Sequence, residues 1–399
     1  MKMKILTQIS ILFCLLLFSG CEKYKTVKVV DENFLEALIK RGVDTDGDGF
    51  ISFDEAAVLK RLEITDCDIF DLGGLESFTN LEELSCGNNE LTSIDLSHNI
   101  ALKKLDIYGN KITSLDISNN INLETLGALY NPLGSLDVYK NTALLNLYCE
   151  GSQITSLDVS NNKELRVLNC TANRLTSLDV SRNQKLEHLT CWINQLESID
   201  VSKNPMLKYL SCGNNKLVTL DLSGNPQLTR LYCEGNELNE IKFNENCVLT
   251  ELFCTDNALS TLSVPIKSAL KRFYCGYNML TSLDMTGCTS LEWFDCSYNQ
   301  LTSLEILSTE SLTYFECSHN LLVSLKTSVN QKLVQLNCAY NNLTTLDISG
   351  CTKLNQIILD QIPSLKKVCV WLLPFPPASV YVSAFGSPNI YYATDCVNK

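Results

Sequence analysis

Residues 44–55 carry oxygen-bearing groups at the spacing of a calcium-binding loop. The segment reads Asp-Thr-Asp-Gly-Asp-Gly-Phe-Ile-Ser-Phe-Asp-Glu, and Gly49 allows the sharp turn that such a loop needs. A hard cation such as Ca²⁺ takes roughly six to eight oxygen ligands. They would come from Asp44, Asp46, Asp48, the Phe50 carbonyl, Ser52 and Glu55. We predict that this loop binds calcium. The alternative is an Asp- and Gly-rich turn that holds no metal.

Local sequence patterns predict a helix on each side of this loop. Upstream, apolar residues recur at helical spacing between positions 34 and 39. Downstream, Ser52 and Glu55 form a capping-box pattern at the start of a second apolar run. We therefore expect a small helical segment at residues 31–58. Because the chain offers no second loop of this kind, we expect calcium to stabilise the fold and not to act as a signal.

The remaining reactive side chains are too scattered to form a catalytic centre. The three histidines are His98, His188 and His319, and none stands at the spacing of a zinc site or of a nucleophile–base pair. The sequence also lacks a phosphate-binding loop. The formal charge of −13, from 32 basic and 45 acidic residues, opposes binding to a phosphate backbone. We expect neither an enzyme nor a nucleic-acid-binding protein.

The amino terminus has the layout of an export signal. Two lysines precede an apolar run at residues 5–18, which is too short to be a good membrane span. Residues 17–21 resemble a bacterial lipobox, in which the cysteine is lipidated and becomes the first residue. We predict that residues 1–20 are removed, that Cys21 carries the lipid anchor and that residues 21–30 form a tether. The alternatives are cleavage by an ordinary signal peptidase and a buried helix.

A leucine recurs every 21 residues without insertion from Leu81 onward, which indicates a solenoid. The later members are Leu102, Leu123, Leu144, Leu165, Leu186, Leu207, Leu228, Leu249, Leu270, Leu291, Leu312, Leu333 and Leu354. Each unit contains Leu-x-x-Leu-x-Cys-x-x-Asn in its first half and Leu-x-x-Leu-Asp-Val-x-x-Asn in its second. Coils stacked about 4.8 Å apart would make one parallel sheet from each half. We predict a β-rich solenoid of about 14 coils with two parallel sheets over residues 81–364.

Two repeated side chains should form columns along the coils. Cysteine fills the third apolar position of the first half in Cys86, Cys149, Cys170, Cys191, Cys212, Cys233, Cys254, Cys275, Cys296, Cys317 and Cys338. Ile107, Ala128 and Leu359 take its place elsewhere, so the column should point inward. In-register parallel strands do not aim these side chains at one another, which favours free packed thiols over disulfides, metal binding or redox chemistry. The asparagine at the ninth place should bond the backbone of each turn.

These motifs carry a family resemblance. Residues 44–55 resemble an EF-hand loop, and the 21-residue units resemble bacterial leucine-rich repeats of the internalin type. Together with the export signal, the chain is similar to surface lipoproteins of Bacteroidetes that join an EF-hand-like segment to such repeats. The resemblance covers residues 21–399. It implies a leucine-rich repeat array that presents an extended surface to proteins or glycans, without naming the ligand.

Both ends of the array depart from the repeat. Residues 59–80 are apolar enough to form a degenerate first coil and amino-terminal cap. After Leu354 the asparagine place falls on Ile362, and residues 365–399, rich in proline and aromatic residues, should close the other end with extended structure. Cys369 and Cys396 lie in this cap, either as a pair or as two free thiols.

The two halves of each coil should present different surfaces. The second half repeats an outward aspartate, which we interpret as a turn-capping column and not as a cation stripe: Asp95, Asp116, Asp137, Asp158, Asp179, Asp200, Asp221, Asp284 and Asp347. The outward positions of the first half vary and include large aromatic residues. Tyr232, Phe253 and Tyr274 occupy the same place in three successive coils and should form a row about 5 Å apart. Arg230, Glu251 and Arg272 precede them, and Tyr148, Tyr209, Trp293 and Tyr314 are further outward aromatic residues.

This aromatic surface is the candidate ligand site, around coils 7 to 12. Exposed rigid aromatic residues beside arginines occur both in protein-binding hot spots and in sugar-stacking platforms. We predict a surface-anchored, non-enzymatic protein that binds an extracellular protein. A glycan-binding accessory of a polysaccharide uptake system is the alternative, and cross-strand packing without a ligand is another. We expect a monomer that is exported to the cell surface or outer membrane and touches the membrane only through its lipid.

Overall fold

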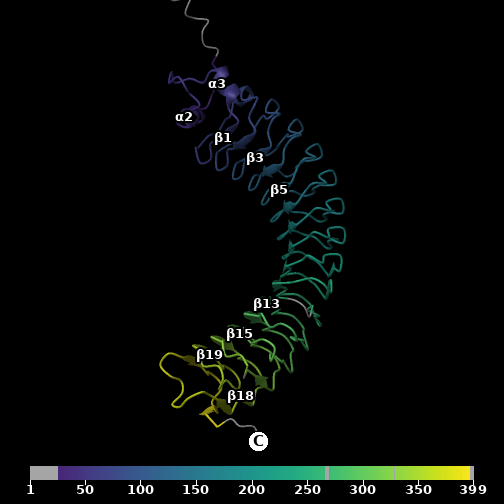
Figure 1. Cartoon of the computed structure of the whole chain (residues 1–399), viewed down its shortest axis with the longest axis vertical. Helices are drawn as coiled ribbons and strands as arrows, with labels where there is room; N and C mark the ends of the chain where they lie inside the picture. Colours follow the sequence, from purple (N-terminus) through teal and green to yellow (C-terminus); the bar gives the residue numbers. More distant parts are fainter. Residues whose placement is uncertain (1–25, 266–268, 328, 396–399) are drawn as a thin grey trace, which may run out of the picture. The chain divides into compact units, whose positions relative to one another are not determined.

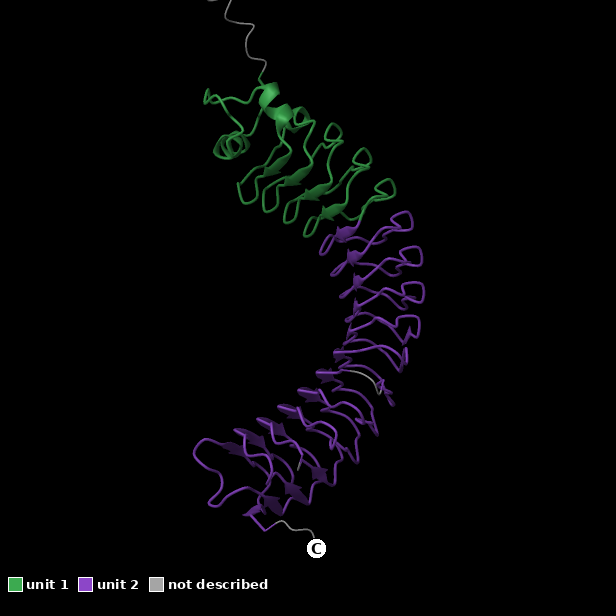
Figure 2. Ribbon diagram, in the orientation of Figure 1, with its two compact units in different colours: residues 1–144 green, residues 145–399 purple. Residues whose placement is uncertain are grey.

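The computed structural model describes residues 26–265, 269–327 and 329–395, and it divides into two compact units (Figure 2). Unit 1 comprises residues 1–144 and unit 2 comprises residues 145–399. The predicted lipidation site Cys21 and the signal segment lie outside the described residues. Within the described ranges, no helix has the length and apolar character needed to span a bilayer.

Two short helices and the loop between them precede the coils of unit 1. Helix α2 (Glu32–Lys40) begins at Asp31, whose Oδ1 accepts bonds from the backbone N–H groups of Asn33 and Phe34. Helix α3 (Phe53–Val58) begins at Ser52 with the predicted capping box to Glu55. Asp31 is 1% exposed, and its Oδ2 also accepts bonds from the N–H groups of Phe70 and Asp71. This one carboxylate therefore ties α2 to the coil that follows.

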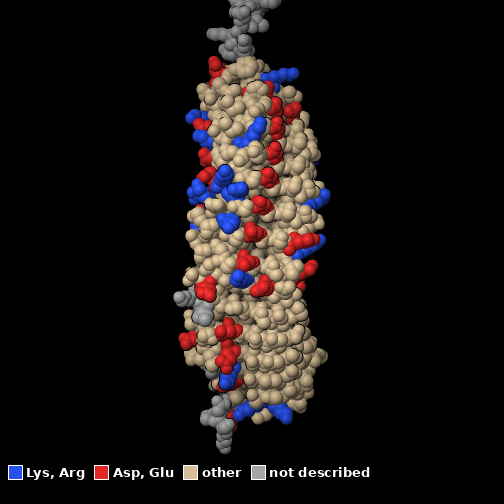
Figure 3. All heavy atoms as spheres, turned by 90° about the vertical axis from the view of Figure 1, so that its right-hand side faces the viewer, with Lys and Arg blue, Asp and Glu red and all other residues tan. Residues whose placement is uncertain are grey.

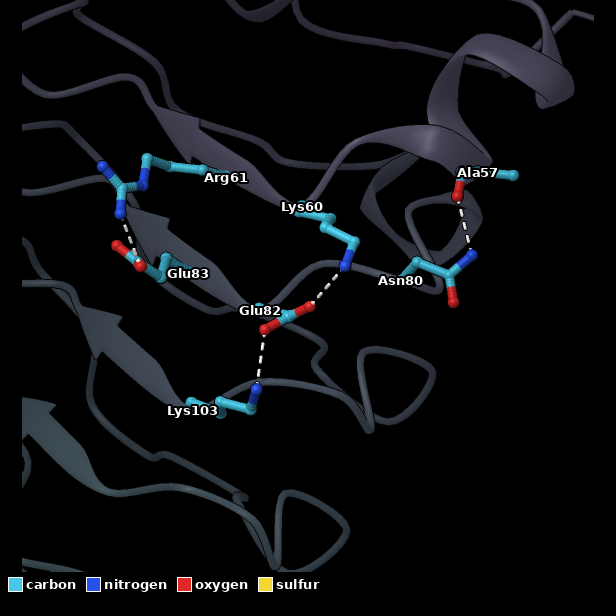
Figure 4. Close-up of polar contacts among 7 residues, drawn as sticks. All are labelled: Ala57, Lys60, Arg61, Asn80, Glu82, Glu83 and Lys103. Carbon is cyan, nitrogen blue, oxygen red and sulfur yellow. Dashed lines mark hydrogen bonds and ion pairs between the residues drawn. The ribbon is translucent and has the colours of Figure 1, made fainter.

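Four parallel strands make the sheet of unit 1. They are β1 (Arg61–Glu63), β2 (Glu83–Ser85), β3 (Lys104–Asp106) and β4 (Thr125–Gly127), paired in sequence order. Strand β1 belongs to residues 59–80, and the turn η1 (Leu75–Ser77) completes that coil. Ion pairs join the first coils in Figure 4: Glu82 lies 3.0 Å from Lys60 and 2.7 Å from Lys103, and Arg61 bonds Glu83.

Twelve first-half strands make the long parallel sheet of unit 2, which follows the inner side of its curve (Figure 1). In order they are β5 (Asn146–Tyr148), β6 (Val167–Asn169), β7 (His188–Thr190), β8 (Tyr209–Ser211), β10 (Arg230–Tyr232), β12 (Glu251–Phe253), β13 (Arg272–Tyr274), β14 (Trp293–Asp295), β15 (Tyr314–Glu316), β17 (Gln335–Asn337), β19 (Gln356–Ile358) and β21 (Tyr381–Ser383). The middle residue of nearly every strand is buried, and its two neighbours face outward.

The second half forms less sheet than the sequence predicted. In the described part of the chain its strands pair in two places only: β9 (Thr219–Leu222) with β11 (Glu240–Phe243), and β16 (Leu325–Lys326), β18 (Thr345–Asp347), β20 (Lys367–Cys369) and β22 (Tyr391–Ala393) in that order. The predicted parallel sheet of the second half is therefore present, but in two separate segments and not as one sheet. Coils on the outer side of a curve lie farther apart than coils on its inner side, which disfavours strand pairing there.

The core is a narrow column of aliphatic side chains and thiols. All eleven cysteines of the predicted column are fully buried and free, which confirms the packed-thiol interpretation. Burial raises the pKa of Cys233 and its column neighbours well above the ordinary thiol value. Three phenylalanines replace the central leucine in successive coils and stack at centroid distances of 5.5 and 5.4 Å: Phe273, Phe294 and Phe315.

Asparagine side chains close the turns as expected. In a representative coil, Asn173 Oδ1 accepts the N–H of Ile154 at 2.9 Å, and Asn173 Nδ2 donates to the carbonyls of Cys149, Cys170 and Thr171. A second asparagine column lies in the other half of the coil, where Asn183 donates to Val159 and Asn162. These bonds satisfy backbone groups that a tight coil leaves without strand partners.

The aspartate column caps turns, as predicted. Each of its nine members accepts a bond from the backbone N–H two residues later; Asp158, for example, accepts from Ser160 at 2.9 Å. These bonds lower the pKa of Asp158. Acidic side chains follow one another in a row on the face drawn in Figure 3.

The carboxyl-terminal cap continues the coil. Strand β21 pairs with β19 and β22 pairs with β20, so residues 365–395 add one further turn with a longer loop between its strands. Cys369 is disulfide-bonded, and Cys396 lies outside the described residues. The alternative of a free Cys369 is therefore wrong.

Candidate functional site

The predicted calcium loop in unit 1 brings three carboxylates together. One oxygen from each of Asp44, Asp46 and Asp48 lies within 4.8 Å of the others, and Asp46 and Asp48 are exposed. Asp44 also accepts the backbone N–H groups of Gly47 and Gly49, which bends the loop around its side chain. The arrangement offers oxygen ligands at one point, as a hard cation requires.

The other three expected ligands differ in how they lie. Glu55 Oε1 accepts bonds from the N–H and the hydroxyl of Thr45, and Glu55 Oε2 accepts from the N–H and hydroxyl of Ser52. These bonds, the one from Ser52 N–H first, lower the pKa of Glu55 to about 2. Glu55, the last residue of the loop, is therefore ionised, but a bidentate contact with a metal ion would require it to give up some of these bonds. Phe50 can offer only its backbone carbonyl, because its side chain has no oxygen.

The predicted aromatic row lies on the sheet of unit 2, in strands β10, β12 and β13. The ring centroids of Tyr232 and Phe253 are 4.8 Å apart, and those of Phe253 and Tyr274 are 4.5 Å apart, with interplanar angles of 24° and 21°. The strands pair in register, so the rings stack face to face. All three side chains are partly buried. We call Tyr232, Phe253 and Tyr274 the aromatic row.

Charged residues support the aromatic row along one side. Glu251 accepts a bond from the Tyr232 hydroxyl and lies 3.6 Å from Arg272, while Arg230 is exposed in the same register. Burial, followed by the bond to Glu251, raises the pKa of Tyr232 well above its usual range. Ring stacking and the bond between Tyr232 and Glu251 therefore fix the geometry of the row without a ligand.

Of the other predicted aromatic residues, one lies beside the aromatic row and two form a separate pair. Tyr209 pairs in register with Arg230, and its ring lies 5.4 Å from Tyr232 at 36°. Trp293 and Tyr314 stand in the register position of Arg272 and stack on each other at 5.2 Å. Trp293 is 40% exposed. The structure thus places the nine expected ligand residues on one sheet, but in two adjacent columns.

A second aromatic series was missed by the sequence analysis. Tyr277, Tyr298, His319 and Tyr340 stack with centroid distances of 4.1, 3.9 and 4.0 Å, each at 12°. Each stands two residues after a column cysteine, at the turn that follows the strand, and each has a positive φ of 50 to 54°. The 21-residue spacing of these four residues is visible in the sequence and indicates a stacked series. They stand at a turn, outside the outward strand positions where the ligand residues were expected. We call this series the turn ladder.

The described residues give this surface groups that can bind a ligand. In the ranges that the structure covers, the only group of three or more potential metal ligands is the Asp44, Asp46 and Asp48 cluster. Aromatic rings, hydroxyls and charged side chains line the sheet instead. Such groups bind ligands through contact area, hydrogen bonds and charge.

Comparison with known proteins agrees with this geometry. No family model matches the sequence, and no curated protein sequence matches it. Among solved structures, the functional domain of InlJ from Listeria monocytogenes is 30% identical, with 85% of this chain and 74% of that chain covered and a TM-score of 0.70. That domain is described as including a cysteine ladder. The chain therefore belongs to the leucine-rich repeat family.

Two more distant structures share the fold. The leucine-rich repeat protein LIC12759 of Leptospira interrogans is 21% identical, covers 83% of this chain and 97% of its own, and has a TM-score of 0.64. The plant peptide hormone receptor RGFR1, solved in complex with RGF2, is 17% identical over 84% of this chain and 66% of its own, with a TM-score of 0.67.

Proposed function

We propose that this protein is a non-enzymatic binding protein that holds an extracellular protein partner on the sheet of unit 2, with the aromatic row at the centre of the contact. The observation that carries the proposal is the stacked, partly buried Tyr232–Phe253–Tyr274 series with Glu251 and Arg272 beside it. Tyrosine side chains lose little conformational entropy on binding, and both tyrosine and arginine are enriched among the residues that dominate protein interfaces.

Ring orientation favours a protein over a glycan. A sugar stacks on the open face of an aromatic ring, but Phe253 has Tyr232 on one face and Tyr274 on the other. The row therefore offers mainly ring edges and hydroxyls, which suit the mixed contacts of a protein surface. The neighbour RGFR1, which binds the peptide RGF2, gives a precedent on the same fold.

The test is binding of the chain to a panel of extracellular proteins, with and without substitution of the row. We expect a protein hit whose affinity falls at least about a hundred-fold in the Tyr232→Ala/Phe253→Ala/Tyr274→Ala variant, since several central aromatic contacts are lost. Tyr148→Ala is the matched control, because Tyr148 occupies the same strand position in β5, outside the row. A hit that the triple variant binds unchanged would refute this placement. Melting curves of each variant verify folding.

A glycan-binding role is the alternative function, and Trp293 is the observation that favours it. This indole is 40% exposed and stacks with Tyr314, so part of its ring system is accessible to a sugar. A soluble polysaccharide that displaces the bound partner, or that binds alone and is lost in Trp293→Ala, would support the alternative and contradict the protein proposal.

We further propose that residues 44–55 bind calcium as a structural ion. Support comes from the convergence of Asp44, Asp46 and Asp48 and from the position of Glu55 at the start of α3. Calcium added to chelator-treated protein should raise the melting temperature, and Asp46→Asn should abolish this rise. Asp54→Asn, which changes a carboxylate outside the expected ligand set, is the control. An equal melting temperature with and without calcium would refute the proposed structural calcium site.

We propose that Cys21 anchors the exported protein at the cell surface or outer membrane. Support comes from the lipobox-like residues 17–21 alone. In a bacterial host, labelled fatty acid should appear on the wild-type protein and not on Cys21→Ser. Export of unlabelled wild-type protein would show cleavage by the ordinary signal peptidase.

A further inference from the structure

The turn ladder places four large aromatic side chains at the left-handed turn position of successive coils. Tyr277, Tyr298, His319 and Tyr340 all have positive φ there, whereas other coils of unit 2 have glycine or a residue that is not aromatic at the same position: Gly151, Ala172, Ile193, Asn214, Gly235, Asp256 and Gln361. Left-handed backbone is unfavourable for a residue with a side chain, and for a bulky one in particular. The rings are nevertheless exposed: Tyr277 by 51%, Tyr298 by 41% and Tyr340 by 47%. Packing in the core does not explain them.

Two carboxylates lie between this ladder and the Trp293–Tyr314 pair. Asp295 in β14 and Glu316 in β15 are register partners, each two residues after a ring of that pair. Both carboxylates lie close enough to the neighbouring rings to act on them. Burial first, and then the charges of Glu316 and Asp295, raise the pKa of Tyr314 to about 12. The hydrogen bond with Tyr298 is the main cause of the raised pKa of Tyr277, and the two carboxylates add to it.

Among the described residues, neither carboxylate has a basic partner. Asp295 accepts bonds from the N–H and hydroxyl of Ser297, and Glu316 accepts from Ser318 N–H and Asn337 Nδ2. No Lys or Arg forms an ion pair with either of them in the described part of unit 2. Elsewhere on the same sheet, Glu187 lies 2.6 Å from Lys208 and Glu251 lies 3.6 Å from Arg272.

We propose that this surface docks a basic, extended segment of a protein partner, with an arginine or lysine side chain seated at Asp295 and Glu316. The rings of Trp293 and Tyr314 on one side, and of Tyr298 and His319 on the other, would flank the aliphatic stem of that side chain. Charge complementarity selects this occupant. A polyanion would be repelled by the two carboxylates, and a neutral glycan could hydrogen-bond them but would not neutralise their charge. A guanidinium both stacks on rings and bonds carboxylates in pairs.

This proposal rests on the proposed function in one respect: both take the partner to be a protein. It adds a second contact with its own chemistry, next to the aromatic row. Because the two contacts use different residues, each can fail without the other.

Binding of a labelled hexa-arginine peptide to the full chain tests the proposal. The Asp295→Asn/Glu316→Gln variant should bind about ten-fold or more weakly, because two charge-assisted contacts are lost. Asp158→Asn/Asp179→Asn changes the net charge equally on exposed turn caps, and asparagine retains the oxygen that caps the turn. This control should bind as the wild type does. Equal weakening in both variants would show attraction by net charge alone and would overturn the proposal.

A second variant tests the ladder without endangering the fold. Tyr298→Gly/His319→Gly removes two rings at positions where glycine suits the backbone, so it should melt near the wild-type temperature while binding the peptide several-fold more weakly. Unchanged peptide affinity in this variant, or no binding by the wild type, would refute the inference. The triple variant of the aromatic row should keep its affinity for hexa-arginine, which separates failure of this proposal from failure of the proposed function.

Discussion

Replacing Asn173 by alanine should strongly destabilise unit 2. The side chain is 8% exposed and supplies the acceptor for Ile154 N–H at 2.9 Å and a donor for the Cys149 carbonyl at 2.9 Å. The carbonyls of Cys170 and Thr171 each keep a second donor, from Asn194 and Gly151. Two buried backbone groups thus lose a partner at about 1–3 kcal/mol each, so the unfolding free energy should fall by roughly 2–6 kcal/mol.

Denaturant unfolding followed by circular dichroism measures this loss, and hydrogen exchange at the Ile154 amide localises it. Asn119→Ala is the control, since Asn119 is exposed and reaches only Ser97 O at 3.5 Å; it should change stability by less than about 0.5 kcal/mol. If Asn173→Ala lowers the unfolding free energy no more than this control does, or if the exchange rate of the Ile154 amide is unchanged, these side-chain bonds do not stabilise the coils.

Three further predictions follow from buried and charged groups. Phe294→Ala should cost about 3–5 kcal/mol of unfolding free energy, whereas Phe294→Leu should cost less than about 1.5 kcal/mol, because leucine fills this position in most coils. A thiol reagent should modify partly exposed Cys67 well before the buried column, and rapid reaction of many thiols in folded protein would contradict the burial. Lys103 and Lys60 lower the pKa of Glu82 to about 2, so its stabilising effect should be present above about pH 4.5 and disappear as the pH falls toward about 2. The melting-temperature difference between wild type and Glu82→Gln should shrink over that range.

The sequence predicted the columns well because the repeat has no insertions. A fixed 21-residue period places equivalent residues in register, so the burial of Cys233, the turn bonds of Asn173 and the capping by Asp158 could all be inferred from one coil and extended to the others. The spacing of the aromatic row followed from the same argument. These are consequences of local geometry repeated along the chain.

Features that depend on curvature or on neighbouring side chains were not predictable in this way. The second-half pattern near Asp179 closely resembles that near Asp221, yet Thr219–Leu222 pairs as a strand and the earlier coils do not. Periodicity gives the direction of a side chain but not the distance between coils. The choice between open and covered ring faces at Phe253 also required the stacking geometry.

Strict repetition also explains where recognition chemistry can reside. Most columns of unit 2 are occupied by the bonds that hold the coils: thiols inside, and asparagines and aspartates at the turns. Changing any of these residues disturbs neighbouring coils as well, so they cannot vary freely with the ligand. Side chains at the outward strand positions and at the left-handed turn position do not belong to these columns. Both hold aromatic residues around coils 8 to 13, where Tyr232 and Tyr298 lie. Binding specificity can therefore change there while the backbone of the solenoid stays the same.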